Sequence, residues 1–202
     1  MLRKSSISRD KWWDGQHRFE HWYRDNTIYF ITARCRGRYP AFRTDEAKRI
    51  FWKRFDHYAP EYGFVPIIRS LLDNHYHALG YLKRGANLGP MMRLIHGSAS
   101  KLVNDVLQRH GEPRLRPFWY DTGKQGYFDG CIRDEIQCRR AFRYTLTQCS
   151  RHGVCADPRD YPHTKVGVDI DRAVRRAHQL RAFMEGVEYA RYAPARRARY
   201  GD

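Results

Sequence analysis

The chain has 202 residues, which is long enough for one domain with a hydrophobic core and short extensions. Its 38 Lys and Arg residues outnumber 22 Asp and Glu residues, so the formal net charge is +16 and a polyanionic partner, most often nucleic acid, is expected. The sequence has no long apolar run, which argues against a membrane partner, and its five cysteines form no CxxC pair, which argues against a zinc ribbon. Its 14 Tyr, 10 Phe and 5 Trp residues, mixed with arginine, favour single-stranded nucleic acid, whose bases stack on aromatic rings.

The predicted elements begin after residues 1–25, a polar, basic and Trp-rich arm. The arm lacks the apolar core of a signal peptide, so a reduced, cytoplasmic protein is expected. β-Branched and aromatic residues predict a strand over Asn26–Cys35, and a Thr N-cap followed by helically spaced apolar residues predicts a helix over Thr44–Gly63. Two antiparallel strands are predicted over Phe64–Leu72 and His75–Leu82, because the Asp-Asn pair between them is a turn former.

The second half of the chain continues this alternation. Apolar residues three and four apart predict a helix over Gly85–Gly111, and a strand region interrupted by a Gly-rich turn follows over Pro117–Arg133. Acids at the start and Gly at the end predict a helix over Asp134–Gly153, and a last helix is predicted from Asp169 to about Tyr189. The order β-α-β-β-α-β-α predicts an α+β fold, a ferredoxin-like (RRM-like) antiparallel sheet with helices packed on one face.

His75 and His77 are the first residues that point to chemistry. Side chains alternate along a strand, so both imidazoles are expected on one face of the sheet and Tyr76 on the other, directed into the helix-packed core. The pleat separates the two histidines by roughly 7 Å, which allows them to share one metal ion if a third ligand comes from elsewhere. Partly exposed polar residues or satisfied core histidines remain the alternative, because so short a motif recurs by chance.

Tyr144 and Gln148 are the second candidate pair, four residues apart and therefore on one face of their predicted helix. A tyrosine hydroxyl that attacks phosphorus forms a covalent phosphotyrosine, and a metal held by imidazole nitrogens and an amide oxygen can polarise the phosphate. A partly exposed, amphipathic surface tyrosine is the alternative. The predicted polar face also contains Gln137, Arg140 and Arg151, and the apolar stripe contains Cys138, Phe142, Leu146 and Cys149.

Two segments together resemble a known family. The segment "LLDNHYHALG" is similar to the "MPNHxH" hairpin, with its HUH motif (U is a bulky residue), of the single-tyrosine HUH transposase superfamily. The segment "FDGCIRDEIQCRRAFRYTLTQCSRHGV" resembles the nucleophile-bearing segment of the REP-associated tyrosine transposases. The resemblance runs from about Thr27 to Val154 and includes the order of strands and helices.

The resemblance implies an activity and a site. It implies metal-dependent nicking and strand transfer of single-stranded DNA through a covalent 5′-phosphotyrosine intermediate, with recognition of hairpin or repeat DNA. In this sequence Tyr144 would be the catalytic nucleophile, and His75, His77 and Gln148 would bind Mg²⁺ or Mn²⁺. The candidate DNA-binding residues are Arg34, Arg36, Arg140, Arg143 and Arg151.

The resemblance also implies how the chain is organised. We expect the basic arm over residues 1–25, a catalytic domain over residues 26–155, and an extension over residues 156–202 with one helix and a basic tail. A bacterial cytoplasmic protein associated with the nucleoid is expected, as a monomer or a homodimer. Some members of the family place the tyrosine helix against the histidines of a partner, so a site within one chain or across two stays open.

The sequence departs from the family at three places and leaves two other functions open. Tyr76 stands at the U position, where the family has an aliphatic residue. Gln148-Cys149 stands where the family has Asn-Pro, and Asp121–Gly126 reads as an insertion. One alternative is a catalytically inactive, host-adopted DNA- or RNA-binding protein on the same fold, and the other is a replication-initiator-type HUH nickase. Relaxases carry three histidines and an N-terminal tyrosine, whereas His152 of this chain is interpreted as a helix cap.

Overall fold

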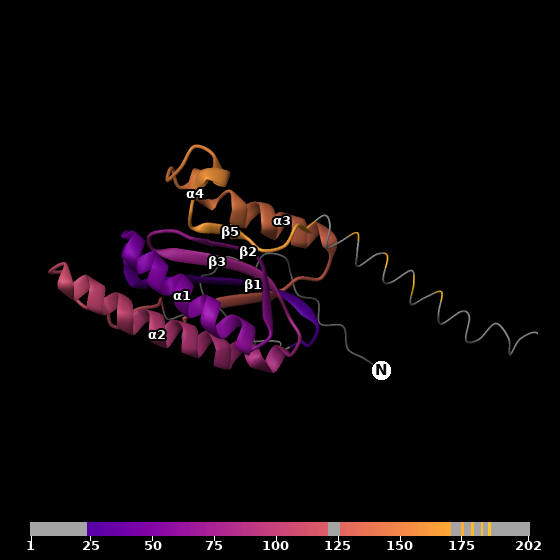
Figure 1. Cartoon of the computed structure of the whole chain (residues 1–202), viewed down its shortest axis with the longest axis horizontal. Coiled ribbons are helices and arrows are strands. Elements are labelled where there is room, and N and C mark those ends of the chain that lie inside the picture. The colour runs from indigo at the N-terminus through magenta and orange to yellow at the C-terminus, as the bar shows by residue number, and fades with distance from the viewer. Residues whose placement is uncertain are drawn as a thin grey trace, which may run out of the picture.

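The computed structural model describes residues 24–120 and 126–170, together with residues 175, 179, 183 and 186 (Figure 1). Within these residues the strands form one antiparallel sheet in the order β4-β1-β3-β2-β5, and the predicted α+β class is confirmed. The strands are β1 (Thr27–Arg34), β2 (Phe64–Leu71), β3 (His75–Leu82), β4 (Phe128–Cys131) and β5 (Thr164–Val166). The α-helices are α1 (Asp45–Glu61), α2 (Leu88–Arg109), α3 (Glu135–Leu146) and α4 (Gln148–Arg151).

The starts of α1 and α3 follow from side-chain caps. The Thr44 hydroxyl accepts a hydrogen bond from the backbone N–H of Ala47 at 3.2 Å, and the Asp134 carboxylate accepts one from the N–H of Gln137 at 2.7 Å. Each cap satisfies a backbone donor that the first helical turn leaves without a partner. Both helices therefore begin within one residue of the predicted position.

The sheet is covered on both faces, which corrects the expectation of helices on one face. Figure 1 shows α1 and α2 on one side of the sheet and α3 on the other. The face toward α1 and α2 carries the larger core, which includes Tyr29, Ile31 and Tyr76. The opposite face is also apolar, because Phe30 and Leu79 point to it in alternation, and α3 covers it. The expectation therefore holds for α1 and α2 and is wrong for α3.

The sheet has one more strand than the sequence predicted. β5 pairs with β2 through Ile68↔Val166 and Ser70↔Thr164, so part of the segment expected as an extension belongs to this sheet. The predicted strand region Pro117–Arg133 contains β4 and a single bridge between Trp119 and Cys35. Within the described ranges no helix has both the length and the apolar character that a membrane crossing requires.

Three predicted features fall wholly or mainly outside the described residues. These are the basic arm over residues 1–25, of which residues 24 and 25 are described, the insertion Asp121–Gly126, of which Gly126 is described, and the last helix and basic tail. Residues 175, 179, 183 and 186, the described positions within that last predicted helix beyond residue 170, are helical.

Candidate active site

His75 and His77 lie side by side on the α3 face of β3, as strand alternation predicts. Their ring centroids are 5.1 Å apart, and His77 is buried while His75 is half-buried. Tyr76 between them points to the opposite face, where it is fully buried, and its hydroxyl lies 2.9 Å from Nε2 of His96 on α2. The expectation that Tyr76 faces the helix-packed core is confirmed. β3 therefore places two imidazoles on its α3 face, and the buried Tyr76 packs into the core on the opposite face.

Each histidine is held by a hydrogen bond at Nδ1. His77 Nδ1 lies 2.7 Å from the Thr32 hydroxyl, and His75 Nδ1 lies 2.6 Å from Oδ1 of Asn74. The Asn74 amide is itself oriented, because its Nδ2 donates to the backbone carbonyl of Arg38 at 3.1 Å. Oδ1 of Asn74 can only accept, so His75 Nδ1 carries the proton and His75 Nε2 has a lone pair. The Nε2 atoms are thus the nitrogens left to bind a ligand.

Gln148 brings an oxygen to this pair of nitrogens. Its side chain is 1% exposed, and its Nε2 donates to the backbone carbonyl of Tyr144 at 3.1 Å, which turns Oε1 toward the histidines. Oε1 lies 3.4 Å from His75 Nε2. Nε2 of His77 is buried and has no hydrogen-bond partner among the described residues. Two imidazole nitrogens and one amide oxygen therefore converge, and a divalent cation would satisfy all three.

Burial keeps both imidazoles neutral. It lowers the pKa of His77 to about 3, with the neighbouring His75 adding to the effect. Burial also lowers the pKa of His75, opposed by the contact with Gln148 and reinforced by His152 and Arg34. Metal binding requires the neutral imidazole, so both side chains are in the ligating form at neutral pH.

Tyr144 lies next to the histidines on the exposed side. Its side chain is 41% exposed, and its ring meets the His77 ring edge-on, with centroids 5.1 Å apart. The Tyr144 ring also contacts Phe30 edge-on, and the guanidinium of Arg151 lies 5.3 Å from the ring centroid. One chain therefore supplies the tyrosine and the histidine pair together.

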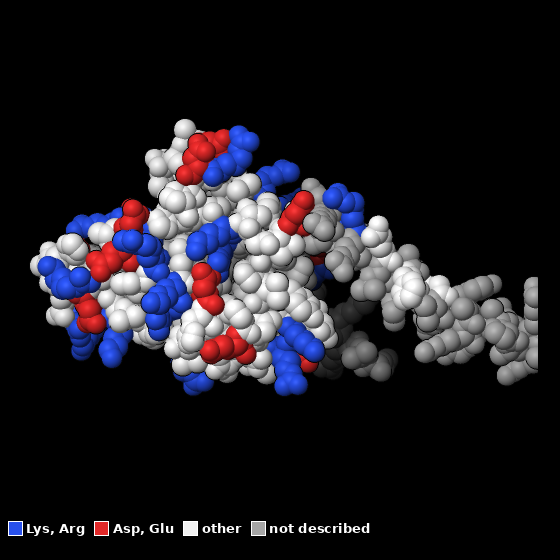
Figure 2. All heavy atoms as spheres, in the orientation of Figure 1, with Lys and Arg blue, Asp and Glu red and all other residues white. Residues whose placement is uncertain are grey.

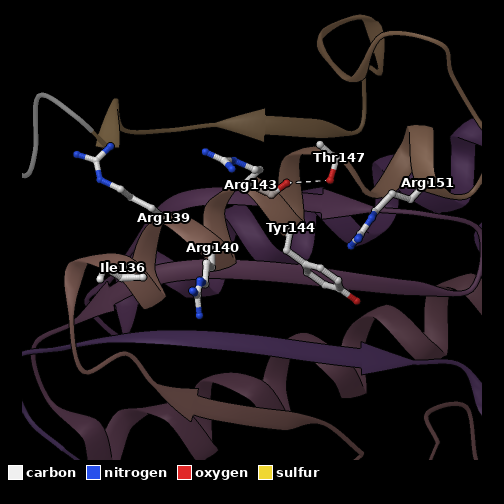
Figure 3. A pocket seen from close by; sticks show the side chains of 7 residues that line it. All are labelled: Ile136, Arg139, Arg140, Arg143, Tyr144, Thr147 and Arg151. Atoms are coloured by element: carbon white, nitrogen blue, oxygen red, sulfur yellow. Dashed lines mark hydrogen bonds between the residues drawn. The ribbon is translucent and has the colours of Figure 1, made fainter.

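A groove of about 490 Å³ runs along α3 beside Tyr144. Figure 3 shows Arg140 and Tyr144 extending from α3 in the same direction, with Arg151 pointing toward the Tyr144 ring. Among the described residues, Arg140, Arg143 and Arg151 make no ion pair, whereas Arg139 pairs with Glu135. The groove is lined by Ile136, Arg139, Arg140, Arg143, Tyr144, Thr147 and Arg151.

The cations of this groove differ from those around α1. Figure 2 shows Lys and Arg interspersed with Asp and Glu on the face that carries α1. Ion pairs on α1 include Glu46 with Arg109, at 2.6 Å, and Asp56 with Lys165, at 3.6 Å. Cations without acidic neighbours are the ones available to phosphate, so the groove beside Tyr144 is the stronger candidate for contact with a polyanion.

The helix that carries Tyr144 is interrupted, which corrects the predicted continuous helix over Asp134–Gly153. α3 ends at Leu146, and Thr147 takes φ −88° and ψ 6° before α4 begins at Gln148. The Thr147 hydroxyl donates to the carbonyl of Arg143 at 2.9 Å, the kind of local bond that competes with the helical pattern. Gln148 is consequently buried among the histidines, although the sequence placed it on a polar face.

His152 also lies in the site, although its sequence position predicted only a helix cap. It caps α4 as expected, yet its ring centroid lies 5.1 Å from that of His75. The signal was present, because His152 follows Gln148 by four residues and so shares its helix face. Among the described residues, no group of three His, Cys, Asp or Glu side chains is arranged to hold a metal ion. The candidate ligand set is therefore two imidazoles and an amide.

The remaining predicted DNA-binding residues lie at the end of β1. Arg34 is the cross-strand partner of His75, and its guanidinium stacks over the Tyr120 ring at 4.0 Å from the centroid. Arg36 instead donates from Nη1 to the backbone carbonyl of Arg116 at 2.6 Å. Arg34 therefore borders the site, whereas Arg36 is engaged in holding a neighbouring loop.

The fold brings the tyrosine of α3 and the histidine pair of β3 together on one face of the sheet, and a solved structure shares this fold. In particular, the chain has the fold of a REP-associated tyrosine transposase whose structure was solved bound to a REP hairpin. The two share 16% sequence identity over 72% of this chain and 80% of the other, with a TM-score of 0.57. This confirms at the level of the fold the likeness that the sequence motifs indicated.

A second solved structure is a weaker match, a candidate transposase from Deinococcus radiodurans R1. It shares 11% identity over 65% of this chain and 97% of the other, with a TM-score of 0.44, and adds nothing to the assignment of the fold. No family model and no curated protein matches the sequence.

Proposed function

We propose that this chain is a transposase that nicks single-stranded DNA and transfers the strand, with Tyr144 as the nucleophile. One observation carries the proposal: the exposed Tyr144 ring lies edge-on against His77, whose Nε2 is buried and lacks a hydrogen-bond partner among the described residues. A buried imidazole nitrogen without a hydrogen-bond partner lowers the stability of the fold unless a ligand binds it. Its position beside a tyrosine in a cationic groove favours phosphoryl-transfer chemistry.

The ligand set fits Mg²⁺ or Mn²⁺. His75, His77 and Gln148 would hold the ion through two imidazole nitrogens and one amide oxygen, and the open side of the site would leave room for phosphate and water. When bound, the ion would polarise a non-bridging phosphate oxygen and so make the phosphorus more electrophilic. Thr32 and Asn74 fix the orientation of the two rings from the opposite side.

The chain's own residues supply the nucleophile and the charge. The Tyr144 oxygen attacks the phosphorus, the bond from phosphorus to the 3′ oxygen breaks, and the tyrosine becomes joined to the 5′ end of the DNA. The phenol loses its proton to solvent, and the departing 3′ oxygen takes one up. Arg140, Arg143 and Arg151 line the groove beside this tyrosine and would neutralise the phosphate as charge develops on it. A second 3′-hydroxyl that attacks the phosphotyrosine reverses these bonds and completes strand transfer.

Hairpin or repeat DNA is the substrate that the proposal favours. The solved transposase that shares this fold was bound to a REP hairpin, and the excess of positive charge here suits a polyanion of that kind. The tyrosine and the histidines meet within one chain, which supports a nicking step carried out by a single copy.

The test is a covalent adduct. The protein is incubated with single-stranded hairpin oligonucleotides and Mn²⁺ and resolved on a denaturing gel, where wild type should form a band that retains the DNA. Tyr144→Phe should form none and still bind DNA, and Tyr58→Phe on α1 serves as the matched control that should retain the band. An adduct that survives in Tyr144→Phe would overturn the assignment of the nucleophile. DNA binding by wild type without any adduct would favour a binding protein on the same fold.

A further inference from the structure

A second hollow lies at the end of β1, beyond the histidine pair. It has a volume of about 280 Å³ and is lined by Arg34, Gly37, Arg38 and Tyr120. Its volume is near the lower end of the range for sites that bind a small molecule, so it has room for one flat group rather than a duplex. All four residues belong to the described part of the chain.

The position of the hollow relative to Tyr144 follows from the register of β1. Phe30, Thr32 and Arg34 alternate onto the same face of β1, where Phe30 contacts Tyr144, Thr32 contacts His77, and Arg34 is the cross-strand partner of His75. Tyr144 and the hollow therefore lie at opposite ends of a line that passes over the two histidines. A DNA strand whose scissile phosphate sits at the histidines would have a neighbouring nucleotide at the hollow.

The lining has the chemistry of a surface that receives a nucleobase. The Arg34 guanidinium stacks over the Tyr120 ring at 4.0 Å, and the backbone N–H of Tyr120 donates to the Arg34 carbonyl at 2.7 Å, which holds the two residues in step. The Tyr120 side chain is 38% exposed. Among the described residues neither Arg34 nor Arg38 has an acidic partner. The bases of single-stranded nucleic acid stack on exposed aromatic rings and guanidinium planes, and the Arg34–Tyr120 pair provides such a surface.

The backbone of the hollow is strained and is tied to the candidate metal ligands. Gly37 and Arg38 both take positive φ, 61° and 57°, a conformation that disfavours a residue with a side chain such as Arg38. Asn74 holds this loop by donating from Nδ2 to the Arg38 carbonyl, and its Oδ1 accepts from His75 Nδ1. The Asn74 side chain therefore links the loop of the hollow directly to His75.

We infer that this hollow is a nucleobase subsite, in which one base next to the scissile phosphate stacks against the Arg34–Tyr120 plane while Arg38 contacts the adjoining phosphate. The inference rests on the proposed function in requiring that the chain bind single-stranded DNA, but it needs binding alone and no cleavage. It gives Tyr120 and Arg38, which take no part in the proposed nicking step, a role in binding DNA.

The experiment combines abasic DNA with a protein variant. In the Tyr144→Phe background, single-stranded oligonucleotides with one abasic position, moved stepwise along the strand, are titrated by fluorescence anisotropy. One position should weaken binding by roughly 5- to 150-fold, the effect of losing one base–aromatic stack. With Tyr120→Ala added, the intact oligonucleotide should bind that much more weakly, and the same abasic position should have no further effect.

Controls separate stacking from folding and from the proposed function. Tyr120→Phe should restore the sensitivity to the abasic position, and Tyr58→Ala on α1 should leave it unchanged. An abasic penalty that is undiminished in Tyr120→Ala, or that is absent at every position, overturns the subsite even if wild type forms the covalent adduct. Failure of the Tyr144→Phe protein to bind any single-stranded DNA overturns the subsite and the proposed function together.

Discussion

Oε1 of Gln148 lies 3.4 Å from Nε2 of His75, and both atoms are hydrogen-bond acceptors. His75 Nδ1–H donates to Oδ1 of Asn74, and Gln148 Nε2 donates to the Tyr144 carbonyl. No proton of these two groups therefore lies between the lone pairs of His75 Nε2 and Gln148 Oε1. Two lone pairs that face one another repel unless a cation lies between them. This contact is the observation that most favours the metal ion proposed above.

Gln148 should therefore govern metal affinity before any DNA is present. Replacing it with Leu removes one of three ligands and should weaken Mn²⁺ binding by more than about tenfold, whereas Gln148→Glu adds a charged oxygen and should tighten it. Isothermal titration calorimetry of the protein without DNA measures both changes. Gln108→Leu on α2 is the matched control, and an unchanged affinity in Gln148→Leu would remove this residue from the ligand set.

Thr32 should act on the same metal through the orientation of His77. Thr32→Val keeps the shape of the side chain but removes the hydroxyl that meets His77 Nδ1 at 2.7 Å. Losing such a support costs about 10- to 100-fold in metal affinity, and Thr32→Ser should restore most of it. Thr27 lies on the same strand, and its hydroxyl donates to the backbone carbonyl of Asp25, so Thr27→Val should leave Mn²⁺ affinity unchanged. Equal effects of the two Val variants would indicate a general change in β1 instead.

The ion pair under the β2–β3 turn should respond asymmetrically to mutation. Lys48 Nζ lies 2.7 Å from Asp73 Oδ1, and the Lys48 side chain is 7% exposed while that of Asp73 is 46% exposed. Asp73→Ala leaves a buried ammonium without its partner and should lower the free energy of unfolding by about 2–4 kcal/mol. Lys48→Met leaves a carboxylate that water can reach and should cost less than about 1 kcal/mol. Urea unfolding measures both, and equal losses would show that Lys48 is solvated in the folded protein.

The sequence specified the features that depend on local periodicity. Alternation placed His75 and His77 opposite Tyr76, and cap residues placed the start of α3 at Asp134, because these depend on a few neighbouring residues. β5 was not predicted because three residues are too few to show a period, and its pairing with β2 is long-range. The burial of Gln148 likewise depends on a break at Thr147 and on the apolar second face of the sheet, neither of which a helical pattern reveals.

Buried histidines should make the fold sensitive to mild acid. Burial lowers the pKa of both His77 and His96 to about 3, against an ordinary value near 6.5. Between pH 6.5 and pH 3 these histidines bind protons in the unfolded chain but not in the folded chain. Their contribution to the free energy of unfolding is therefore fully present above pH 6.5 and is lost as the pH falls toward 3. The expected slope is about 1.4 kcal/mol per pH unit for each histidine.

His96→Gln isolates one of these two contributions, because Gln can still accept a hydrogen bond from the Tyr76 hydroxyl. The free energy of unfolding, measured with urea at pH 7, 6 and 5, should decline less steeply in this variant than in wild type. Exposed His110→Gln is the control and should follow the wild-type slope. A slope in His96→Gln that equals that of wild type would mean that the folded protein accommodates the charged imidazole of His96.

The unpaired arginines beside Tyr144 should determine how DNA binding depends on salt. Arg140 and Arg143 line the groove and make no ion pair among the described residues, so each is free to neutralise one phosphate. Arg140→Gln and Arg143→Gln should each reduce by about 0.7 the slope of the logarithm of affinity against the logarithm of salt concentration, the value for single strands. The measurement is anisotropy with a single-stranded oligonucleotide between about 50 and 200 mM salt. Arg109→Gln is the control, because Arg109 is already paired with Glu46, and this variant should leave the slope unchanged. If Arg109→Gln reduces the slope as much as Arg140→Gln does, the DNA contacts a much wider surface than the groove.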